Sequence, residues 1–432
     1  MKKYILIILC YLITLPVWSY NVNMIVEHYS VDQGLPNNTV NCTLKDRDGF
    51  IWFGTWYGLC CFDGVKFKTF NKQEYNSDVP PRKIQRIVED KNGYIWVKTI
   101  DRKLYIFNKV TESFHAVYDD MKNYSENIQV IKLQSTAEGD ILLLTKDKNL
   151  LLASVDGQGQ VDIKILFDSR DEINKHDYRL KHHVLCETEE YISWVGTDYK
   201  VATVRKGEEL ASRPADFITN KIKSENQFTS FFEDGKKVWV GEDSGVFYSI
   251  DAKTGMVNRY VLSDIKGAIS NLMVTPAGCV YLSVAGQGTY EYDLTDRKLQ
   301  KLNTEMNDAQ VSYAFIDQYD KIWFHENEKA LIYYDPLNRT SKRFPFTMSG
   351  KITTLYAEDA GERGLFFLSP AGEAWVFDRE NLAMLSINEM KQVANDKAGQ
   401  QFYHLFLDGD GVLWLSSAVE GVYCINFPKK TI

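Results

Sequence analysis

The residue types used for catalysis and metal binding occur in this sequence, but their spacing matches no established motif. There is no Gly-x-Ser-x-Gly nucleophile elbow and no His-Glu-x-x-His zinc helix. His182 and His183 are adjacent, so in a strand their side chains would point to opposite faces. The stretch "DGDG" (408–411) lacks the distal Glu of a calcium loop. We therefore expect no catalytic residue, no metal site and no cofactor.

Paired carboxylates are a further chemistry to consider, because two of them about 5 to 9.5 Å apart can hydrolyse a glycoside. The Asp-Gly pairs of this chain, such as Asp48-Gly49, fit tight hairpin turns. A Ser-x-Asp-x-Gly-x-x-Trp box of the sialidase type is absent, since Arg47 and Lys91 stand where its Asp would be. The sequence does not place carboxylates in space, so a glycosidase or lyase stays open as an alternative.

A different set of side chains could bind a ligand without catalysing a reaction. Aromatic rings can stack on the apolar faces of a sugar, while carboxylates and amides bond its hydroxyls. Trp56 and Tyr57 are the strongest pair, because a two-residue turn gives two large aromatics no packing partner. The candidate ligand-binding residues, all in comparable turns, are Trp56, Tyr57, Asp101, Arg102, Asp198, Tyr199, Asp243, Gln287 and Glu326.

A repeated apolar segment precedes these turns and must position them. The first copy is "IWFGT", and its central aromatic serves as an anchor for finding the others. The anchors follow one another at intervals of 42 to 52 residues: Trp52, Trp96, Leu142, Trp194, Trp239, Tyr281, Trp323, Phe366 and Trp414. Nine copies at such a period indicate a repeat architecture.

Each unit divides into four short strands. In the first unit these are "TVNCTLKD" (39–46), the anchor strand, "GLCCFD" (58–63) and "FKTFN" (67–71). The anchor strand is apolar on both faces, so we expect neighbouring sheets to cover it on both sides. Repeated four-stranded antiparallel units predict an all-β fold, a β-propeller, with the anchor aromatics buried between blades.

The two ends of the chain complement each other. The last unit has no fourth strand after "GVYCIN" (421–426), and an unpaired strand, "MIVEHYS" (24–30), precedes the first unit. We expect these segments to pair and close the ring, which covers an exposed strand edge. Nine motifs then form one ring. The alternative is a ring of seven or eight blades, closed near "EAWVFD" (373–378), with residues 402–432 loosely attached.

The N-terminal segment differs from the rest of the chain. Lys2 and Lys3 precede an apolar stretch, residues 4–15, and small residues follow, so residues 1–19 are expected to be a secretory signal peptide. An uncleaved membrane anchor is the alternative. Residues 20–432 are expected to form a single propeller domain in the periplasm, without a membrane span. Loss of the two lysines takes the formal net charge from −8 to −10. This charge argues against nucleic acid as a partner, although a local basic patch could override the average.

Six cysteines lie outside the signal segment, and none forms a Cys-x-x-Cys pair. Most fall within strand patterns, where a thiol behaves as a small apolar side chain. Buried free thiols are therefore expected. A disulfide from Cys42 to Cys60 or Cys61 remains an alternative, because export permits oxidation.

Residues 28–70 resemble the two-component regulator propeller repeat. The resemblance rests on "DQGLPNNTV", "KDRDGFIWFGT" and "GLCCFDGVKFKTF", and "IVEDKNGYIWVKT" in the second unit is similar. It implies the periplasmic sensor propeller of a hybrid two-component system, with an oligosaccharide as ligand. A further sensor or kinase polypeptide, or a second copy of this chain, is the implied protein partner. Kinase, receiver and DNA-binding motifs are absent from the sequence, so we expect no enzyme activity. A protein-interaction scaffold is the other alternative.

Overall fold

The computed structural model of the chain describes most of the residues that follow the N-terminal segment. The described residues are 24–71, 78–122, 124, 129–146, 150–167, 185–187, 191–195, 201–206, 216–217, 222–251, 253–302, 311–326, 329–345, 355–369, 371–388, 402–417 and 419–427. The segment expected to be a signal peptide lies outside them. Among the described residues, none of the helices has the length and apolar composition needed to cross a bilayer.

The described strands form nine antiparallel four-stranded sheets, which we call blades 1 to 9 in chain order. Blades 1 to 3 comprise β2 (Val40–Lys45), β3 (Ile51–Thr55), β4 (Gly58–Phe62), β5 (Phe67–Phe70); β6 (Ile84–Glu89), β7 (Ile95–Thr99), β8 (Leu104–Asn108), β9 (Ser113–Ala116); and β10 (Val130–Ser135), β11 (Ile141–Thr145), β12 (Leu150–Val155), β13 (Val161–Phe167). Blades 4 to 6 comprise β14 (Leu185–Glu187), β15 (Tyr191–Val195), β16 (Val201–Arg205), β17 (Asp216–Phe217); β18 (Phe228–Glu233), β19 (Lys237–Glu242), β20 (Val246–Asp251), β21 (Val257–Val261); and β22 (Ile269–Val274), β23 (Cys279–Val284), β24 (Gly288–Asp293), β25 (Leu299–Lys301). Blades 7 to 9 comprise β26 (Val311–Ile316), β27 (Ile322–Glu326), β28 (Ala330–Asp335), β29 (Thr340–Pro345); β30 (Tyr356–Asp359), β31 (Leu365–Leu368), β32 (Ala374–Asp378), β33 (Ala383–Ser386); and β34 (Phe402–Leu407), β35 (Val412–Ser417), β36 (Val422–Asn426) with β1 (Ile25–Tyr29).

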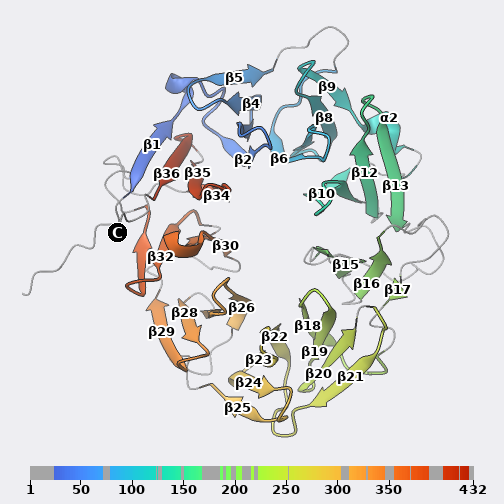
Figure 1. The fold of residues 1–432 in the computed structure, drawn as a ribbon, viewed down its shortest axis with the longest axis vertical. Coiled ribbons are helices and arrows are strands. Elements are labelled where there is room, and N and C mark those ends of the chain that lie inside the picture. The colour runs from blue at the N-terminus through green and yellow to red at the C-terminus, as the bar shows by residue number, and fades with distance from the viewer. Residues whose placement is uncertain are drawn as a thin grey trace, which may run out of the picture.

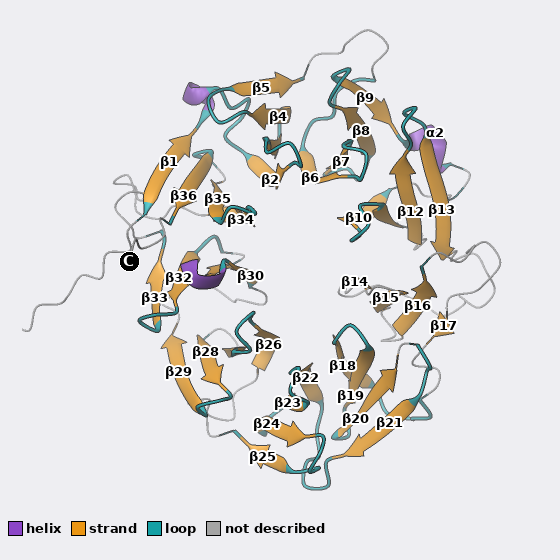
Figure 2. Ribbon diagram, in the orientation of Figure 1, coloured by secondary structure: helices purple, strands orange, loops and turns teal. Residues whose placement is uncertain are grey.

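The sheets are arranged as a ring, with the first strand of each blade nearest the centre and the fourth at the outside (Figure 1). The fold is nearly all β, and the described residues include three short helical segments: 3-10 turns at Val31–Gln33 and Gly361–Arg363 and α2 at Tyr118–Met121 (Figure 2). The predicted all-β propeller of four-stranded blades is confirmed. Each of the nine sequence anchors falls in the second strand of a different sheet.

The ring closes through the N-terminal strand. Strand β1 pairs antiparallel with β36, with Ile25 opposite Asn426 and Tyr29 opposite Val422. The predicted pairing of residues 24–30 with 421–426 is therefore confirmed, and closure near residues 373–378 is excluded. His28 stacks on Tyr423, with ring centroids 4.4 Å apart, so side chains reinforce the backbone pairing.

The anchor tryptophans fill the space between blades. Trp52 is buried and lies 5.6 Å, centroid to centroid, from Phe107 of blade 2. Trp323 of blade 7 is also buried and lies 4.6 Å from Phe377 of blade 8 in a T-shaped arrangement. Burial of such rings stabilises each junction through area and edge-to-face contact. Their predicted role in the core is confirmed for the anchors whose side chains the structure describes.

An aspartate fixes the turn between the first and second strands and also bonds the anchor indole. In blade 1 the Asp46 carboxylate accepts backbone N–H groups of Asp48 (3.0 Å) and Phe50 (2.9 Å), and Trp52 Nε1 donates to it at 2.8 Å. The same arrangement recurs for the pairs Asp90–Trp96, Asp234–Trp239, Asp317–Trp323 and Asp408–Trp414. A buried indole N–H needs an acceptor, and this carboxylate supplies it.

Close approach of neighbouring blades requires small side chains at particular points. A Cβ at Gly54 would overlap Cys42 Sγ and Ile84, the first residue of the inner strand of blade 2. The bulge residue Asn41 spans the same junction, donating from Nδ2 to the Ile84 carbonyl at 2.6 Å. The junction therefore combines apolar packing with a hydrogen bond from one inner strand to the next.

The cysteines described in full are free thiols: Cys42, Cys60, Cys61, Cys279 and Cys424. The expectation of free thiols is confirmed for these residues, and the alternative disulfide from Cys42 is not formed. Burial raises the pKa of Cys42 and of Cys60 to about 12, which keeps both as unreactive thiols.

Candidate ligand-binding site

Strand direction divides the loops of the ring between two rims. Strands of a blade alternate in direction, so turns between the second and third strands share one rim with the connections to the next blade. We call this the upper rim. The lower rim carries the turns between first and second strands, such as residues 46–50. Upper-rim turns are held by a repeated bond, in which Trp56 N donates to Thr39 O (3.2 Å) and Asp243 N to Gln227 O (3.0 Å).

Trp56 and Tyr57 form the two-residue turn between β3 and β4. The Thr55 hydroxyl fixes this turn, because it accepts from Tyr57 N at 3.0 Å and donates to Gly58 O at 2.8 Å. Gly58 has φ 132°, which a side chain would disfavour. The turn projects both aromatics into solvent, where Trp56 is 44% and Tyr57 50% exposed. The expectation that neither is buried between blades is confirmed.

Two cations from the next blade lie against these aromatics. Lys83 Nζ is 5.4 Å from the ring centroid of Trp56, and Arg82 Cζ is 5.1 Å from that of Tyr57. The backbone joins the same segments, since Lys83 N donates to Trp56 O at 3.0 Å. Both distances are within the range of cation–π attraction. Sequence analysis missed Arg82 and Lys83, although their position just before an inner strand places them on the upper rim.

The second turn of blade 2 continues this surface. Ile100 N donates to Lys83 O at 2.9 Å, and Arg102, with φ 67°, is exposed beyond it. Asp101 accepts the Thr99 hydroxyl and lies 3.4 Å from Lys103, and the hydrogen bond from Thr99 lowers its pKa. Of the two candidates in this turn, Arg102 therefore remains available to a ligand, while Asp101 is already engaged within the turn.

The remaining predicted candidates do not join this surface. Asp243 is exposed in the β19–β20 turn, and the Gln287 amide donates to Lys266 O in blade 6. Glu326 differs from the expectation of an exposed turn residue. It is the last residue of β27, is 5% exposed, and accepts from Arg343 Nε at 2.9 Å. The other two candidates, Asp198 and Tyr199, lie outside the described residues.

Lys98 is a buried cation beneath the blade 2 turn. It is 6% exposed, and its ammonium donates to Gln85 Oε1 at 2.6 Å. Burial, together with the nearby charges of Arg102 and Arg86, lowers the pKa of Lys98 to about 8. Arg86 stands directly opposite Lys98 in the pairing of β6 with β7. A desolvated lysine beside two guanidinium groups marks this region as a candidate binding site.

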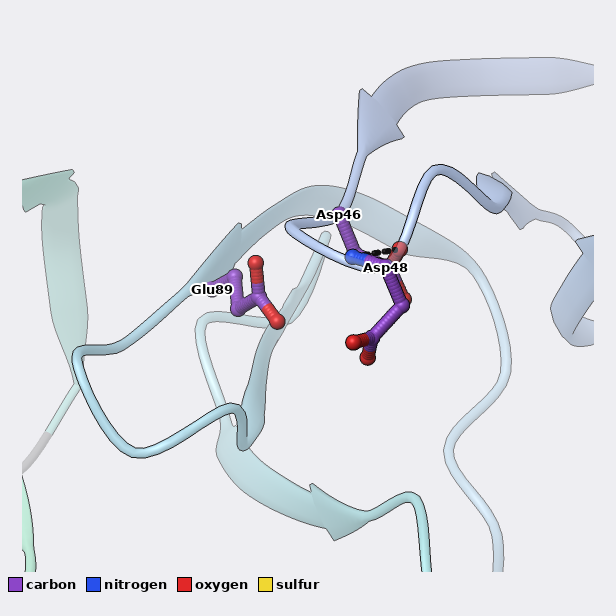
Figure 3. A group of neighbouring side chains, drawn as sticks. All are labelled: Asp46, Asp48 and Glu89. Carbon is purple, nitrogen blue, oxygen red and sulfur yellow. Dashed lines mark hydrogen bonds between the residues drawn. The ribbon is translucent and has the colours of Figure 1, made fainter.

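The lower rim holds a cluster of three acidic side chains, which are residue types that can bind a metal ion. Asp46, Asp48 and Glu89 bring one carboxylate oxygen each to within 4.8 Å of one another (Figure 3). The Lys109 ammonium lies among them, 3.0 Å from Asp46, 2.7 Å from Asp48 and 2.8 Å from Glu89. Burial lowers the pKa of Lys109, but the hydrogen bonds to these carboxylates outweigh burial and raise it. The cluster is an internal ion-pair network between blades 1 and 2.

Comparisons with known proteins match the first repeat. Residues 34–57 match the family model described as Two component regulator propeller. A histidine kinase of Formosa agariphila is 34% identical over 84 residues, which is 18% of this chain and 6% of that protein. The chain therefore matches a small part of that kinase.

Solved structures show weaker likeness. The extracellular domain of a proposed one-component system from B. thetaiotaomicron is 15% identical, with a TM-score of 0.41 and coverage of 93% of this chain and 66% of that one. Virginiamycin B lyase from Staphylococcus aureus is 9% identical, with a TM-score of 0.35 and coverage of 94% and 100%. Likeness at this level carries no weight for function. The resemblance seen in the sequence is confirmed by the family match: the chain carries a two-component regulator propeller repeat at residues 34–57, within an all-β propeller.

Proposed function

We propose that this chain is the ligand-binding propeller of a two-component signalling system, that it acts in the periplasm, and that its ligand is an oligosaccharide. The expected signal peptide at residues 1–19 supports export, and the regulator propeller repeat supports a part in signalling. Ligand binding would bias the assembly between two arrangements, and a further sensor or kinase polypeptide would read the difference.

The observation that carries the proposal is the exposed aromatic pair. Trp56 and Tyr57 lie within the segment that matches the repeat, on a turn that four hydrogen bonds hold in place. Exposing two large aromatic rings leaves apolar area in water, which gives no benefit to a folded monomer. Sugars present apolar faces of C–H groups that can cover such rings, while their hydroxyls meet the polar groups of the same rim.

The test is glycan-array binding with the full chain, followed by calorimetry of each hit with two variants. Trp56→Ala combined with Tyr57→Ala should reduce affinity about tenfold or more, because the two rings supply the apolar contact area of the proposed site and a loss of about 1.4 kcal/mol is already tenfold. Phe50→Ala is the matched control. Phe50 is 41% exposed but belongs to a lower-rim turn, so its removal should leave the affinity unchanged.

Binding that survives loss of both aromatics would move the site elsewhere on the ring. A chain that binds no glycan on the array, yet captures a sensor polypeptide, would favour a protein-interaction scaffold over the ligand-binding role.

A further inference from the structure

Blade 2 gathers positive charge on an acidic protein. The chain has a formal net charge of −8, yet "RKIQR" (82–86) opens the inner strand of this blade, and two more cations lie on the neighbouring strand and turn. We call this set the cationic patch: Arg82, Lys83, Arg86, Lys98 and Arg102. Like charges in proximity destabilise one another, so their accumulation needs a compensating partner.

The patch is continuous with the aromatic pair. Backbone hydrogen bonds connect Trp56 O to Lys83 N and Lys83 O to Ile100 N, which links the turns of blades 1 and 2 through the start of β6. Two of the patch cations pack directly against the rings of Trp56 and Tyr57. A ligand that contacts these rings would therefore also lie close to the cations.

Protein carboxylates do not neutralise the exposed part of the patch. Within the described part of the chain, no ion pair joins a carboxylate to Arg82, Lys83, Arg86 or Arg102. Asp101 is nearby but is engaged by Thr99 and Lys103.

Inner-strand groups of other blades also face the patch. The charge of Arg86 acts on Glu358 of blade 8 and on His404 of blade 9. Burial raises the pKa of Glu358 and lowers that of His404, so burial disfavours the charged form of each. His404 adds no negative charge, whereas the exposed Glu358 carboxylate offsets part of the charge of Arg86 and leaves that of Arg82, Lys83 and Arg102.

We infer that the ligand of this site is an acidic oligosaccharide, whose carboxylate or sulfate groups bind the cationic patch while a sugar ring stacks on Trp56 and Tyr57. This inference rests on the proposed function and narrows its ligand class. Guanidinium groups bind carboxylate and sulfate through paired, charge-assisted hydrogen bonds, which suits the exposed Arg82 and Arg102. The lowered pKa of Lys98 shows that its surroundings disfavour the protonated form, and a bound anion would stabilise that form.

The test measures by calorimetry how the full chain binds three tetrasaccharides. A galacturonan tetrasaccharide carries carboxylates, a chondroitin sulfate tetrasaccharide carries sulfates and carboxylates, and a cellulose tetrasaccharide is neutral. We expect at least one acidic sugar to bind about tenfold or more tightly than the neutral one, with affinity falling as salt rises. Arg82→Gln combined with Lys83→Gln should weaken the affinity for the acidic sugar about tenfold. Lys236→Gln combined with Lys298→Gln removes the same charge from exposed lower-rim positions and should change it little.

Each alternative outcome is distinct. Equal binding of neutral and acidic sugars, unaffected by Arg82→Gln with Lys83→Gln, would overturn the acidic ligand while keeping the oligosaccharide proposal. Binding of inorganic sulfate, a DNA oligonucleotide or phosphatidylglycerol vesicles as tightly as the acidic sugars would show that charge alone is recognised, which also overturns it. Failure of every tetrasaccharide here, together with a blank array, would reject both proposals. Unchanged melting temperatures of the variants would show that the fold is intact.

Discussion

The cations beside Trp56 and Tyr57 on the upper rim differ in their partners from the partly buried cations of the lower rim. On the lower rim, Lys109 lies among three carboxylates, and the Arg379 guanidinium lies 2.6 Å from Asp317 and 2.7 Å from Asp359. On the upper rim of blades 1 and 2, Arg82 and Lys83 lie against aromatic rings without a described carboxylate partner.

The contrast separates structural charge from charge available to a ligand. Lys109 and Arg379 each follow the third strand of a blade and reach the turn aspartate of the preceding blade, so each ties two blades together. Within the described part of the chain, Arg82 and Lys83 of the upper rim are paired with no carboxylate. The paired cations therefore stabilise the fold, whereas the unpaired cations lower its stability when no ligand is bound.

The largest expected effect compares two tryptophans. Trp239→Ala should lower the free energy of unfolding by about 3–5 kcal/mol, because it empties a space between blades and leaves Asp234 without its indole donor. Trp56→Ala should cost less than about 1 kcal/mol, since that ring is 44% exposed. Urea unfolding of both variants measures the difference. Similar losses would contradict the division between anchor and rim.

The next effect concerns the lower-rim cation. Lys109→Met should lower the free energy of unfolding by about 2–4 kcal/mol, since it leaves Asp46 and Glu89 close together and buries the Asp46 carboxylate without its cation. The loss should shrink on adding Asp48→Asn, because one repelling charge is removed. Thermal and urea unfolding of the single and double variants check both statements. If Lys109→Met leaves the free energy of unfolding unchanged, the network does not stabilise the fold.

The smallest effect has the opposite sign. Lys98→Met should raise the free energy of unfolding at pH 7 by about 1–2 kcal/mol, because it removes a buried charge repelled by Arg86 and Arg102 while keeping most of the side-chain volume. Urea unfolding without ligand measures the gain. The same variant should bind the acidic tetrasaccharide more weakly than the parent chain.

The pH dependence of this last effect follows from the lowered pKa of Lys98. The folded state releases the Lys98 proton near pH 8, whereas the unfolded state holds it up to about pH 10.5. The unfolded chain therefore binds more protons between these values, and the stability of the parent chain rises with pH there. The stability gained by Lys98→Met should be largest below pH 8 and should vanish near pH 10.5. A gain independent of pH would show that packing, rather than charge, causes it.

Some features that the sequence analysis missed had a local signal. Four of the five turn aspartates stand six residues before their tryptophan, as in Asp46 and Trp52, so the spacing alone could have revealed the pairing. Glu326 was expected in the turn between the second and third strands of its unit. The β27 strand instead runs through Glu326, which Arg343 of the outer strand holds in place.

The repeat, the order of strands within each unit and the closing pair could all be predicted from the sequence alone. These depend on alternation, turn residues and period, all of which are local or recur along the chain. Tertiary structure alone decided which cations meet which partners. Lys109 reaches Asp46 across 63 positions, and Arg82 reaches Tyr57 across a blade junction. Such contacts depend on how adjacent sheets twist and pack, which the sequence of a single strand or turn does not specify.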